Sequence, residues 1–342
     1  MCEGSGVRSN RWMKIITDLS KISKGLYPDL VIGLGNFDGL HLAHQTILAL
    51  IRERAKRLGG VSAVFTFREH PQRVLHTREN RPILTSVVHK LYLLKQSGID
   101  LCFLAEFTVP FSRKSPEDFI VDVFVRQLGA KEICLGFNSR FGHERRGDSA
   151  LMRRLAEKHH FTFVEGPPVR VGDRVVSSSK IRSCVKAGKL DEASKLLGRS
   201  YSFLGTVVPG SGRGERLGFP TANLDPASEV LPPQGVYAAW IRIWDCRLVE
   251  SESGISSLEG SVTGKFLKAI MNYGRRPTFG KDSKAIPEVY ILDYHEDLSQ
   301  RTVEVIVGKR LREERTFRDE RALKEQIKTD IESGQKWLAQ QS

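Results

Sequence analysis

Two histidines, His41 and His44, follow a glycine-containing turn at residues 35–39 (GNFDG). Apolar residues 30–34 precede the turn, and residues 45–58 have helical apolar spacing, so the stretch predicts strand, turn and helix. Such a turn directs backbone N–H groups toward an anion, and its glycines allow close approach of a ligand. Imidazoles three residues apart at a helix start can contact the same phosphate. The alternatives are a structural turn or half of a metal site, although no third His or Cys lies at ligand spacing nearby.

A second candidate cluster occupies residues 210–224 (GSGRGERLGFPTANL). Its glycines, with Arg213 and Arg216, predict a mobile basic loop that can close over phosphates. Thr221 and Asn223 lie two residues apart, so in an extended chain they face the same side. A hydroxyl and a carboxamide oxygen are hard ligands that suit Mg²⁺. The alternative is a plain β-turn in which both side chains satisfy nearby backbone groups.

Two further places carry weaker signals. Glu288 begins the strand-like stretch EVYILDY, where a carboxylate can act as general base for a hydroxyl, although an exposed strand residue explains it equally well. Three serines, residues 177–179, precede a helical stretch with Lys180 and Arg182. Serines at a helix start are usually caps, but hydroxyls beside basic side chains also suit the phosphates of a nucleotide.

Composition limits the classes of protein. The 342 residues accommodate two domains, and no stretch approaches the ~18 apolar residues that a membrane span needs. The N-terminal stretch lacks the apolar segment of a signal peptide. Five scattered cysteines argue against a disulfide framework and suit a reducing compartment, so we expect a cytoplasmic protein. The net charge of +13 favours anionic partners, either nucleotides or nucleic acid.

The first half of the chain alternates strand and helix patterns, which predicts a mostly parallel sheet with helices on both faces. Ligands bind such sheets beyond the carboxyl ends of the strands. The histidine turn, the turn at residues 66–71 (TFREHP) and the loop at residues 137–148 (FNSRFGHERRGD) are all expected at that edge, as one site from three loops. Strands are expected at 30–34, 61–67, 99–105, 132–136 and, at the sheet edge, 161–164; helices are expected at 44–58, 84–97, 115–128 and 149–159.

From Tyr201 the pattern changes to strands separated by Gly- and Pro-rich turns, which predicts an antiparallel barrel or sandwich. Residues 246–264 are expected to form a long flexible loop between two strands. A final helix is expected at residues 317–338, with Leu323, Ile327, Ile331 and Leu338 as its buried stripe. Residues 1–29 form a polar lead-in that we expect to be partly disordered up to about Arg11.

Together these motifs resemble those of the bifunctional prokaryotic riboflavin kinase/FMN adenylyltransferases, also called FAD synthetases. The resemblance runs in order from about residue 30 to residue 338. In the first half, GNFDGLHLAH is similar to the family's GxFDGxHxGH, TFREHP to TFxPHP, GFNSRFGHERRGD to GxDFxFGxxxxG, and SSSKIR to SSTxIR. In the second half, GRGERLGFPTANL, GRRPTF, EVYILD and KRLREERTF resemble the kinase motifs.

The resemblance implies an α/β Rossmann-like nucleotidylyltransferase domain at residues 30–182, a helical connector at 183–200, and an antiparallel β-barrel riboflavin kinase domain with a C-terminal helix at 201–342. It also implies two ATP-dependent reactions. The barrel would phosphorylate riboflavin to FMN, and the α/β domain would adenylylate FMN to FAD with release of pyrophosphate. Mg²⁺ would accompany ATP, while FMN and FAD would be substrate and product rather than redox cofactors.

The resemblance also implies roles for individual residues. Thr221 and Asn223 would hold Mg²⁺ with the nucleotide, and Glu288 would activate the hydroxyl of riboflavin. His41 and His44 would stabilise charge on the transferred α-phosphate. The implied nucleotide- or phosphate-binding residues are Gly35, Phe37, Asp38, Gly39, Ser177, Ser178, Arg182, Gly212, Arg213, Gly214 and Pro220. The implied flavin-binding residues are Asn138, Phe141 and Arg276.

The sequence departs from the family pattern at several positions. Ala43 replaces a glycine between the histidines, and Ser139 stands where an aromatic residue is usual. Arg68 and Glu69 alter the TFxPHP turn, and Tyr290 stands where the family often has histidine. Since the unusual phosphate- and flavin-site residues fall in the first half, the alternative function is a riboflavin kinase with an impaired adenylyltransferase domain.

A basic nucleic-acid-binding protein is the less favoured alternative. The chain lacks an RNA-binding motif with paired aromatic residues, and its basic residues are interspersed with acidic ones, as in KRLREERTFRDER. The expected partners are therefore the small molecules ATP, riboflavin, FMN and FAD. We expect no membrane and no nucleic-acid partner, and a weak homo-oligomer is compatible with the sequence.

Overall fold

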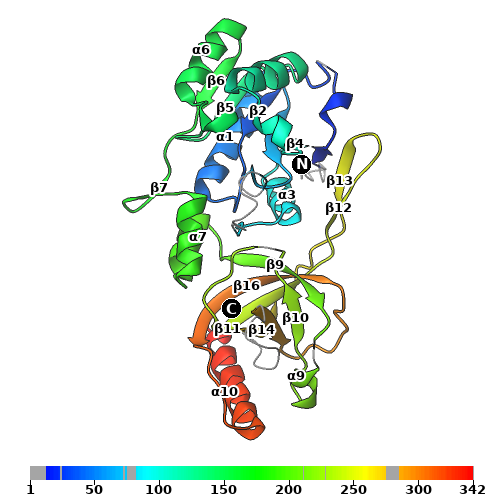
Figure 1. Ribbon diagram of the computed structural model, residues 1–342, viewed down its shortest axis with the longest axis vertical. Coiled ribbons are helices and arrows are strands. Elements are labelled where there is room, and N and C mark those ends of the chain that lie inside the picture. Colours follow the sequence, from blue (N-terminus) through cyan, green and yellow to red (C-terminus); the bar gives the residue numbers. More distant parts are fainter. Residues whose placement is uncertain are drawn as a thin grey trace, which may run out of the picture. The chain divides into compact units, whose positions relative to one another are not determined.

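The computed structural model describes residues 13–23, 25–71, 74, 82–210, 212–227, 229–274 and 285–341 (Figure 1). Contacts within the chain divide it into two units. The first unit comprises Met1–Arg81, Val87–Val176 and Arg247–Glu259, and the second comprises Pro82–Ser86, Ser177–Cys246 and Gly260–Ser342. This division places the helix that begins after Ser177 in the second unit. It also places residues 247–259, which lie in the second half of the sequence, in the first unit. No helix in the described part of the chain is long and apolar enough to cross a bilayer.

The first unit is built on an eight-stranded sheet of order β12-β13-β1-β4-β3-β2-β5-β6. The six strands β1 to β6 run parallel, with β6 at an edge, which confirms the mostly parallel sheet. Strands β13 and β12 are added antiparallel beyond β1. The strands are β1 (Lys14–Ile16), β2 (Val31–Leu34), β3 (Ser62–Phe67), β4 (Leu101–Ala105), β5 (Glu132–Leu135), β6 (Thr162–Glu165), β12 (Arg247–Val249) and β13 (Ile255–Glu259).

Local signals in the sequence set the helix ends of this unit. The side chain of Asp148 accepts a hydrogen bond from Leu151 N at the start of α6, and Gly59 takes the left-handed conformation that ends α1. The helices are η1 (Leu19–Lys21), α1 (Leu42–Leu58), α3 (Val87–Gln96), α4 (Val109–Ser112), α5 (Pro116–Asp118), the π-helix η2 (Phe119–Gln127), η3 (His143–Arg145) and α6 (Ser149–His159). A small separate ribbon joins β7 (Arg170–Val171) to β8 (Arg174–Val175).

Two expectations about this unit were wrong. The lead-in contains β1, whose Ile15 and Ile16 are fully buried, while residues 1–12 lie outside the described part. Residues 246–264 are not a free loop, because they contain the β12–β13 hairpin that pairs with β1. Strands β1 and β13 are short, and the contact between Thr17 and Gly254 beside them joins residues 237 positions apart in the sequence. No local pattern therefore predicts the pairing.

The second unit is a closed antiparallel barrel of order β10-β15-β14-β11-β16-β9, so the barrel of the two expected alternatives is correct. Its strands are β9 (Ser202–Val208), β10 (Ala222–Asp225), β11 (Gly235–Trp244), β14 (Leu267–Gly274), β15 (Ile286–Ile291) and β16 (Thr302–Arg312). Its helices are α7 (Ser178–Lys186), α8 (Leu190–Leu197), α9 (Arg213–Arg216) and α10 (Glu320–Ala339).

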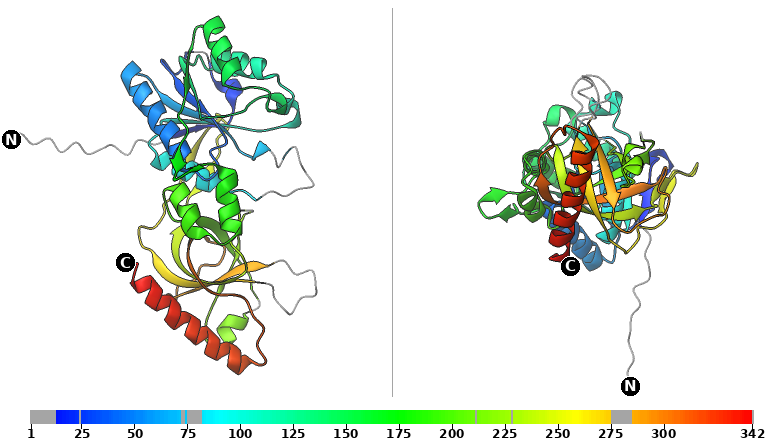
Figure 2. Two further views of the ribbon diagram at one scale, coloured as in Figure 1. Left: turned by 90° about the vertical axis from the view of Figure 1, so that its left-hand side faces the viewer. Right: turned by 90° about the horizontal axis from the view of Figure 1, so that it is seen from below.

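Helix α10 packs against the barrel (Figure 2), and its buried residues lie on the same side of the helix as the predicted stripe. The residues that it buries are Asp330, Gly334 and Leu338. A Cβ on Gly334 would lie 2.2 Å from Ile270 Cδ1, so a larger residue there would displace the end of the Ile270 side chain. Of the predicted stripe only Leu338 is buried, and the others, Leu323, Ile327 and Ile331, line a cleft of the barrel unit.

Candidate active sites

The first candidate site lies at the carboxyl end of β2. From β2 the chain moves outward through β3 and β4, and then returns to the other side of β2 with β5. The strand order therefore changes direction between β2 and β5, the position at which parallel α/β sheets bind ligands. The GNFDG turn follows β2, and the loop at residues 137–148 follows β5, so two of the three expected loops lie at this switch point. The third, TFREHP, begins at the end of the neighbouring strand β3.

The GNFDG turn is shaped by close packing around Phe37. The Phe37 side chain is buried, its φ is +48°, and its ring would contact a Cβ on Gly35 at 3.3 Å. Gly39 has a φ of +82°, a region that favours glycine. Asp38 is only 4% exposed, so its carboxylate is held inside the turn. The four predicted residues thus form one compact turn, while their contact with a nucleotide stays a prediction.

The two histidines lie together at the start of α1. Their rings stack with centroids 3.7 Å apart and planes 12° from parallel. His41 Nδ1 accepts a hydrogen bond from His44 N (3.3 Å), so a neutral His41 ring carries its proton on Nε2. Burial, and then the charges of His41 and Lys90, hold the pKa of His44 well below its usual range. A neutral His44 therefore begins this helix beside His41, whose Nε2 can donate a hydrogen bond.

Lys90 is a residue of this site that the sequence analysis missed. Its buried ammonium group donates to Phe67 O (2.6 Å) and Thr66 Oγ1 (3.3 Å) at the end of β3. Thr66 Oγ1 in turn donates to Asn36 O (3.2 Å) in the GNFDG turn. A signal existed, because Lys90 lies at helical spacing from Val87 and Leu94 and so falls on the apolar face of α3.

The loop after β5 holds the predicted flavin ligands in different surroundings. Asn138 is exposed and has a φ of +53°. Phe141 is 7% exposed and exchanges backbone hydrogen bonds with Gly147, where a Cβ would lie 2.5 Å from the Phe141 ring. Phe141 therefore packs inside the loop and shapes it, and the contact of both residues with a flavin stays a prediction.

The predicted triphosphate ligands lie on α7, which the chain's contacts group with the second unit. Ser177 Oγ accepts a hydrogen bond from Lys180 N (3.4 Å) and so caps the helix, as the structural alternative expects. Arg182 Nη2 donates to Ser179 Oγ (3.3 Å). A phosphate-binding role for Ser177, Ser178 and Arg182 stays a prediction.

The second candidate site is a cleft of about 1930 Å³ within the barrel unit. On its wall, Asn223 of β10 lies opposite Glu288 of β15, and Glu288 lies opposite Asn272 of β14. Residues opposite one another on adjacent strands share a face, and all three line the cleft. The sequence analysis missed Asn272, because nothing local in β14 shows which strand it pairs with.

The glycine loop lies directly against the predicted metal ligands. A Cβ on Gly210 would lie 1.9 Å from Asn223 Nδ2, and one on Gly214 would lie 2.7 Å from Thr221 Oγ1. Only glycines at both positions let the loop backbone approach these side chains so closely. Two neutral oxygen ligands beneath a glycine cradle fit a Mg²⁺ ion that phosphates help to coordinate.

Other predicted residues of this loop are placed as follows. Gly212, with a φ of +66°, and Pro220 both line the cleft, and Arg213 begins the short helix α9. Arg276 lies outside the described residues. The ring of Tyr290 packs edge-on against Phe219, with centroids 5.8 Å apart.

Comparisons with known proteins identify both units. Residues 25–180 match a family model described as FAD synthetase, and residues 197–338 match one described as riboflavin kinase. A protein of Bacillus subtilis is 31% identical over 88% of this chain and 90% of its own length. One from Buchnera aphidicola of Acyrthosiphon pisum is 30% identical over 95% and 98%. Both relatives are described as bifunctional riboflavin kinase/FMN adenylyltransferases.

A solved structure covers both units as well. It is titled a macrolide-efflux protein from Streptococcus pneumoniae, and it matches 94% of this chain and 99% of its own with a TM-score of 0.77 and 25% identity. That title describes the other protein, and the likeness supports the fold. With two family models in order and relatives matched almost end to end, the chain belongs to the bifunctional riboflavin kinase/FMN adenylyltransferase family, which makes FMN from riboflavin and FAD from FMN at the expense of ATP.

Proposed function

We propose that the barrel cleft carries the kinase reaction, with Glu288 as general base and Thr221 and Asn223 as ligands of Mg²⁺. The observation that carries this proposal is the row of Asn223, Glu288 and Asn272 across three paired strands beneath the glycine loop. This row puts the Glu288 carboxylate next to Asn223, a proposed ligand of the Mg²⁺ that accompanies ATP. The acceptor hydroxyl and the γ-phosphate have to meet at this place.

The chemistry at this cleft is an in-line phosphoryl transfer. The 5′-hydroxyl oxygen of riboflavin bonds to the γ-phosphorus, the bond to the β-phosphate oxygen breaks, and ADP leaves. Glu288 takes the hydroxyl proton. Bound Mg²⁺ neutralises charge on the phosphates. The glycine loop contributes backbone close to the phosphates, and its glycines leave room for the side chains of Thr221 and Asn223.

We assign the adenylyl transfer to the stacked histidines of the first unit. A phosphate oxygen of FMN bonds to the α-phosphorus of ATP, and pyrophosphate leaves. The attacking oxygen is already ionised, so this step needs no general base. It needs donors that stabilise charge on the α-phosphate, and His41 and His44 can supply N–H groups for this. No covalent enzyme intermediate is required.

Separate substitutions test the two assignments. Glu288→Gln should lower riboflavin phosphorylation by about 10²-fold or more, because it removes the base and keeps the shape. The same variant should still convert supplied FMN to FAD. His44→Ala should do the reverse, so that FMN accumulates. The measurement is a time course of flavins separated by chromatography after incubation with riboflavin or FMN and Mg·ATP.

Glu296→Gln is the matched control, since Glu296 also lines the cleft but bonds Tyr294. Near-normal phosphorylation by Glu288→Gln would remove Glu288 from the role of base. Wild-type protein that leaves supplied FMN unconverted would favour the kinase-only alternative.

A further inference from the structure

The β12–β13 hairpin, residues 247–259, lies in the sequence between two barrel strands, β11 and β14, yet it folds as part of the first unit (Figure 1). Strand β13 pairs with β1 through Ile15–Ser256 and Ile16–Ile255. Without the hairpin, β1 would be the edge of the sheet. A segment encoded inside the kinase half therefore completes the sheet that carries the adenylyltransferase site.

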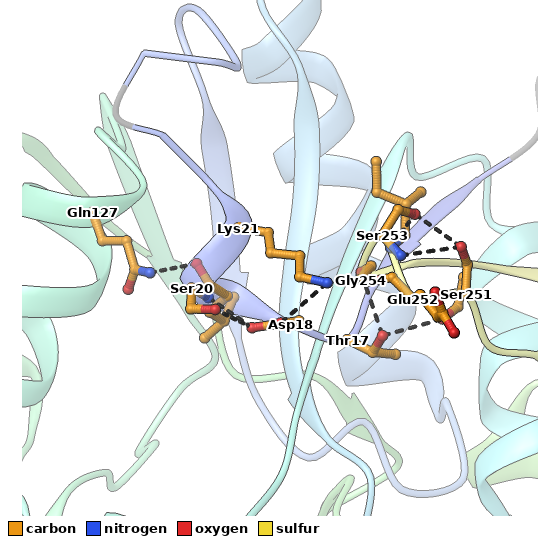
Figure 3. A network of polar contacts seen from close by, with 12 residues as sticks. Thr17, Asp18, Ser20, Lys21, Gln127, Ser251, Glu252, Ser253 and Gly254 are labelled. Carbon is orange, nitrogen blue, oxygen red and sulfur yellow. Dashed lines mark hydrogen bonds and ion pairs between the residues drawn. The ribbon is translucent and has the colours of Figure 1, made fainter.

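Polar contacts fix this hairpin beyond the strand pairing (Figure 3). Thr17 N donates to Gly254 O (2.9 Å), and Thr17 Oγ1 lies 3.1 Å from Ser256 Oγ. The Lys21 ammonium group donates to the backbone oxygen of Glu252. Ser256 and Leu258 are each 3% exposed. The hairpin is thus built into the unit and does not lie loosely on its surface.

One side chain of the hairpin reaches the TFREHP turn. Arg68 Nη1 lies 2.7 Å from Glu250 Oε1 in the hairpin, and Arg68 Nε lies 2.7 Å from Glu106 Oε1 after β4. The Arg68 side chain is only 23% exposed, whereas both carboxylates are more than half exposed. Arg68 N also donates to Ala105 O (2.9 Å). The guanidinium therefore bridges the hairpin to the loop after β4.

The turn that Arg68 anchors supports the nucleotide turn. The two residues before Arg68 are Thr66, which donates to Asn36 O of the GNFDG turn, and Phe67, which accepts from Lys90. A displacement at residue 68 is therefore transmitted through two covalent neighbours to the loop that follows β2. The histidines begin the helix that follows this same loop.

We propose that Glu250 and Arg68 are a positioning pair for FMN adenylylation, so that a hairpin within the kinase sequence sets the efficiency of the other reaction. This inference rests on the assignment of FMN adenylylation to the first unit. Neither residue needs to touch the substrate. The ion pair fixes the position of the TFREHP turn, and that turn in turn positions the GNFDG turn and the histidines.

The test compares point variants in the full-length protein. Because the pair is partly exposed, Glu250→Gln should lower kcat/KM for FMN adenylylation by about two- to fivefold, while riboflavin phosphorylation stays unchanged. Arg68→Gln should lower it further, since Glu106 also loses its partner. Arg68→Lys should recover part of the loss. The double variant should be no worse than Arg68→Gln alone, because Arg68→Gln already removes the contact with Glu250 that the second change would remove.

Glu252→Gln is the matched control, since that neighbour contacts Lys21 through its backbone oxygen. Normal adenylylation by Glu250→Gln, an equal loss in both reactions, or simple additivity in the double variant would overturn the proposal. A wild-type protein that makes no FAD from FMN would instead refute the function on which the proposal rests.

A deletion tests the hairpin as a whole. Asp245 N donates to Ser261 O (2.9 Å), so the two ends of the insertion lie together, and residues 247–259 can be replaced by a two-glycine turn. Riboflavin phosphorylation should stay within about twofold, because distant changes act independently. Adenylylation should fall more than in any point variant, and the Thr17 amide should lose its protection from hydrogen exchange. Full adenylylation without the hairpin would contradict the proposal.

Discussion

At the scale of single residues, Lys90 is a buried charge next to the proposed adenylyltransferase site. Burial lowers the pKa of Lys90 from its ordinary value of 10.5 to about 8, against the opposing effects of Cys102, Asp38 and Glu69. The unfolded chain therefore holds this proton to higher pH than the folded protein does. The protonated lysine costs stability below pH 8, and this cost disappears as the pH rises from about 8 to about 10.5.

This lowered pKa predicts a pH dependence for one of the two reactions. Above about pH 8, Lys90 loses the charge that faces Asp38, and its hold on Phe67 O weakens, so FMN adenylylation should fall relative to riboflavin phosphorylation. Lys90→Met should catalyse FMN adenylylation more slowly at neutral pH, and its rate should not show the decrease above about pH 8. The measurement is the ratio of the two rates from about pH 7 to pH 9.5.

The phosphorylation rate of the same sample serves as the internal control, because Lys90 belongs to the first unit. A flat ratio in the wild type, or the same decrease in Lys90→Met, would contradict the role assigned to this charge. Lys90→Met also leaves Phe67 O without its donor, which should cost about 1–3 kcal/mol of stability. A thermal melt of the variant measures that cost separately.

At the scale of elements, the glycine loop of the barrel makes a steric prediction. Gly210→Ala would place a methyl group 1.9 Å from Asn223 Nδ2, so that Asn223 or the loop must move. Because Asn223 is a proposed ligand of the metal–nucleotide complex, KM for Mg·ATP in the kinase reaction should rise by about tenfold. Initial rates at varied Mg·ATP check this.

Gly264→Ala provides the control for that substitution, since an added Cβ there meets no atom within 4 Å. FMN adenylylation should be normal in both variants. An unchanged KM in Gly210→Ala would mean that the loop can move away without disturbing the nucleotide, and that Asn223 is less constrained than its packing indicates.

Sequence patterns predicted those elements whose signals are local. Helix 149–159 matches α6, because a capping aspartate and an amphipathic pattern define it. That His41 and His44 lie close together was predictable from their spacing, whereas the stacking of their rings was not. The alignment of Glu288 with Asn223 and Asn272 was not, because register between distant strands is set by the closing of the barrel. The pairing of β1 with the hairpin was missed because it joins two segments that lie far apart in the sequence.

For the C-terminal helix, the periodicity indicated the correct side, but of the predicted stripe only Leu338 is fully buried. The barrel surface decides which residues of that side are buried most deeply. A Cβ on Gly334 would lie 2.2 Å from Ile270 Cδ1, and Arg312 bonds the buried Asp330 through two nitrogens. Neither a glycine nor an aspartate is counted as apolar in a helical pattern, so these two contacts could not be read from the sequence.

At the scale of the whole molecule, each unit contains the proposed reacting groups of one reaction. The stacked histidines belong to the first unit, and Glu288 with the glycine loop belongs to the second. FMN is the product of one site and the substrate of the other. If FMN is released between the two reactions, the sites need not be on the same molecule, and two differently impaired chains should complement each other.

Mixing Glu288→Gln with His44→Ala tests this. Given riboflavin, the first variant should make almost no FMN, and the second should make FMN but little FAD, each rate being lowered by about 10²-fold. The mixture should make FAD after a lag, because FMN from one chain must first accumulate in solution. Adding FMN at the start should remove the lag, and dilution should lengthen it. A mixture that makes no FAD, although each variant catalyses its remaining reaction, would show that FMN has to stay with the chain that made it.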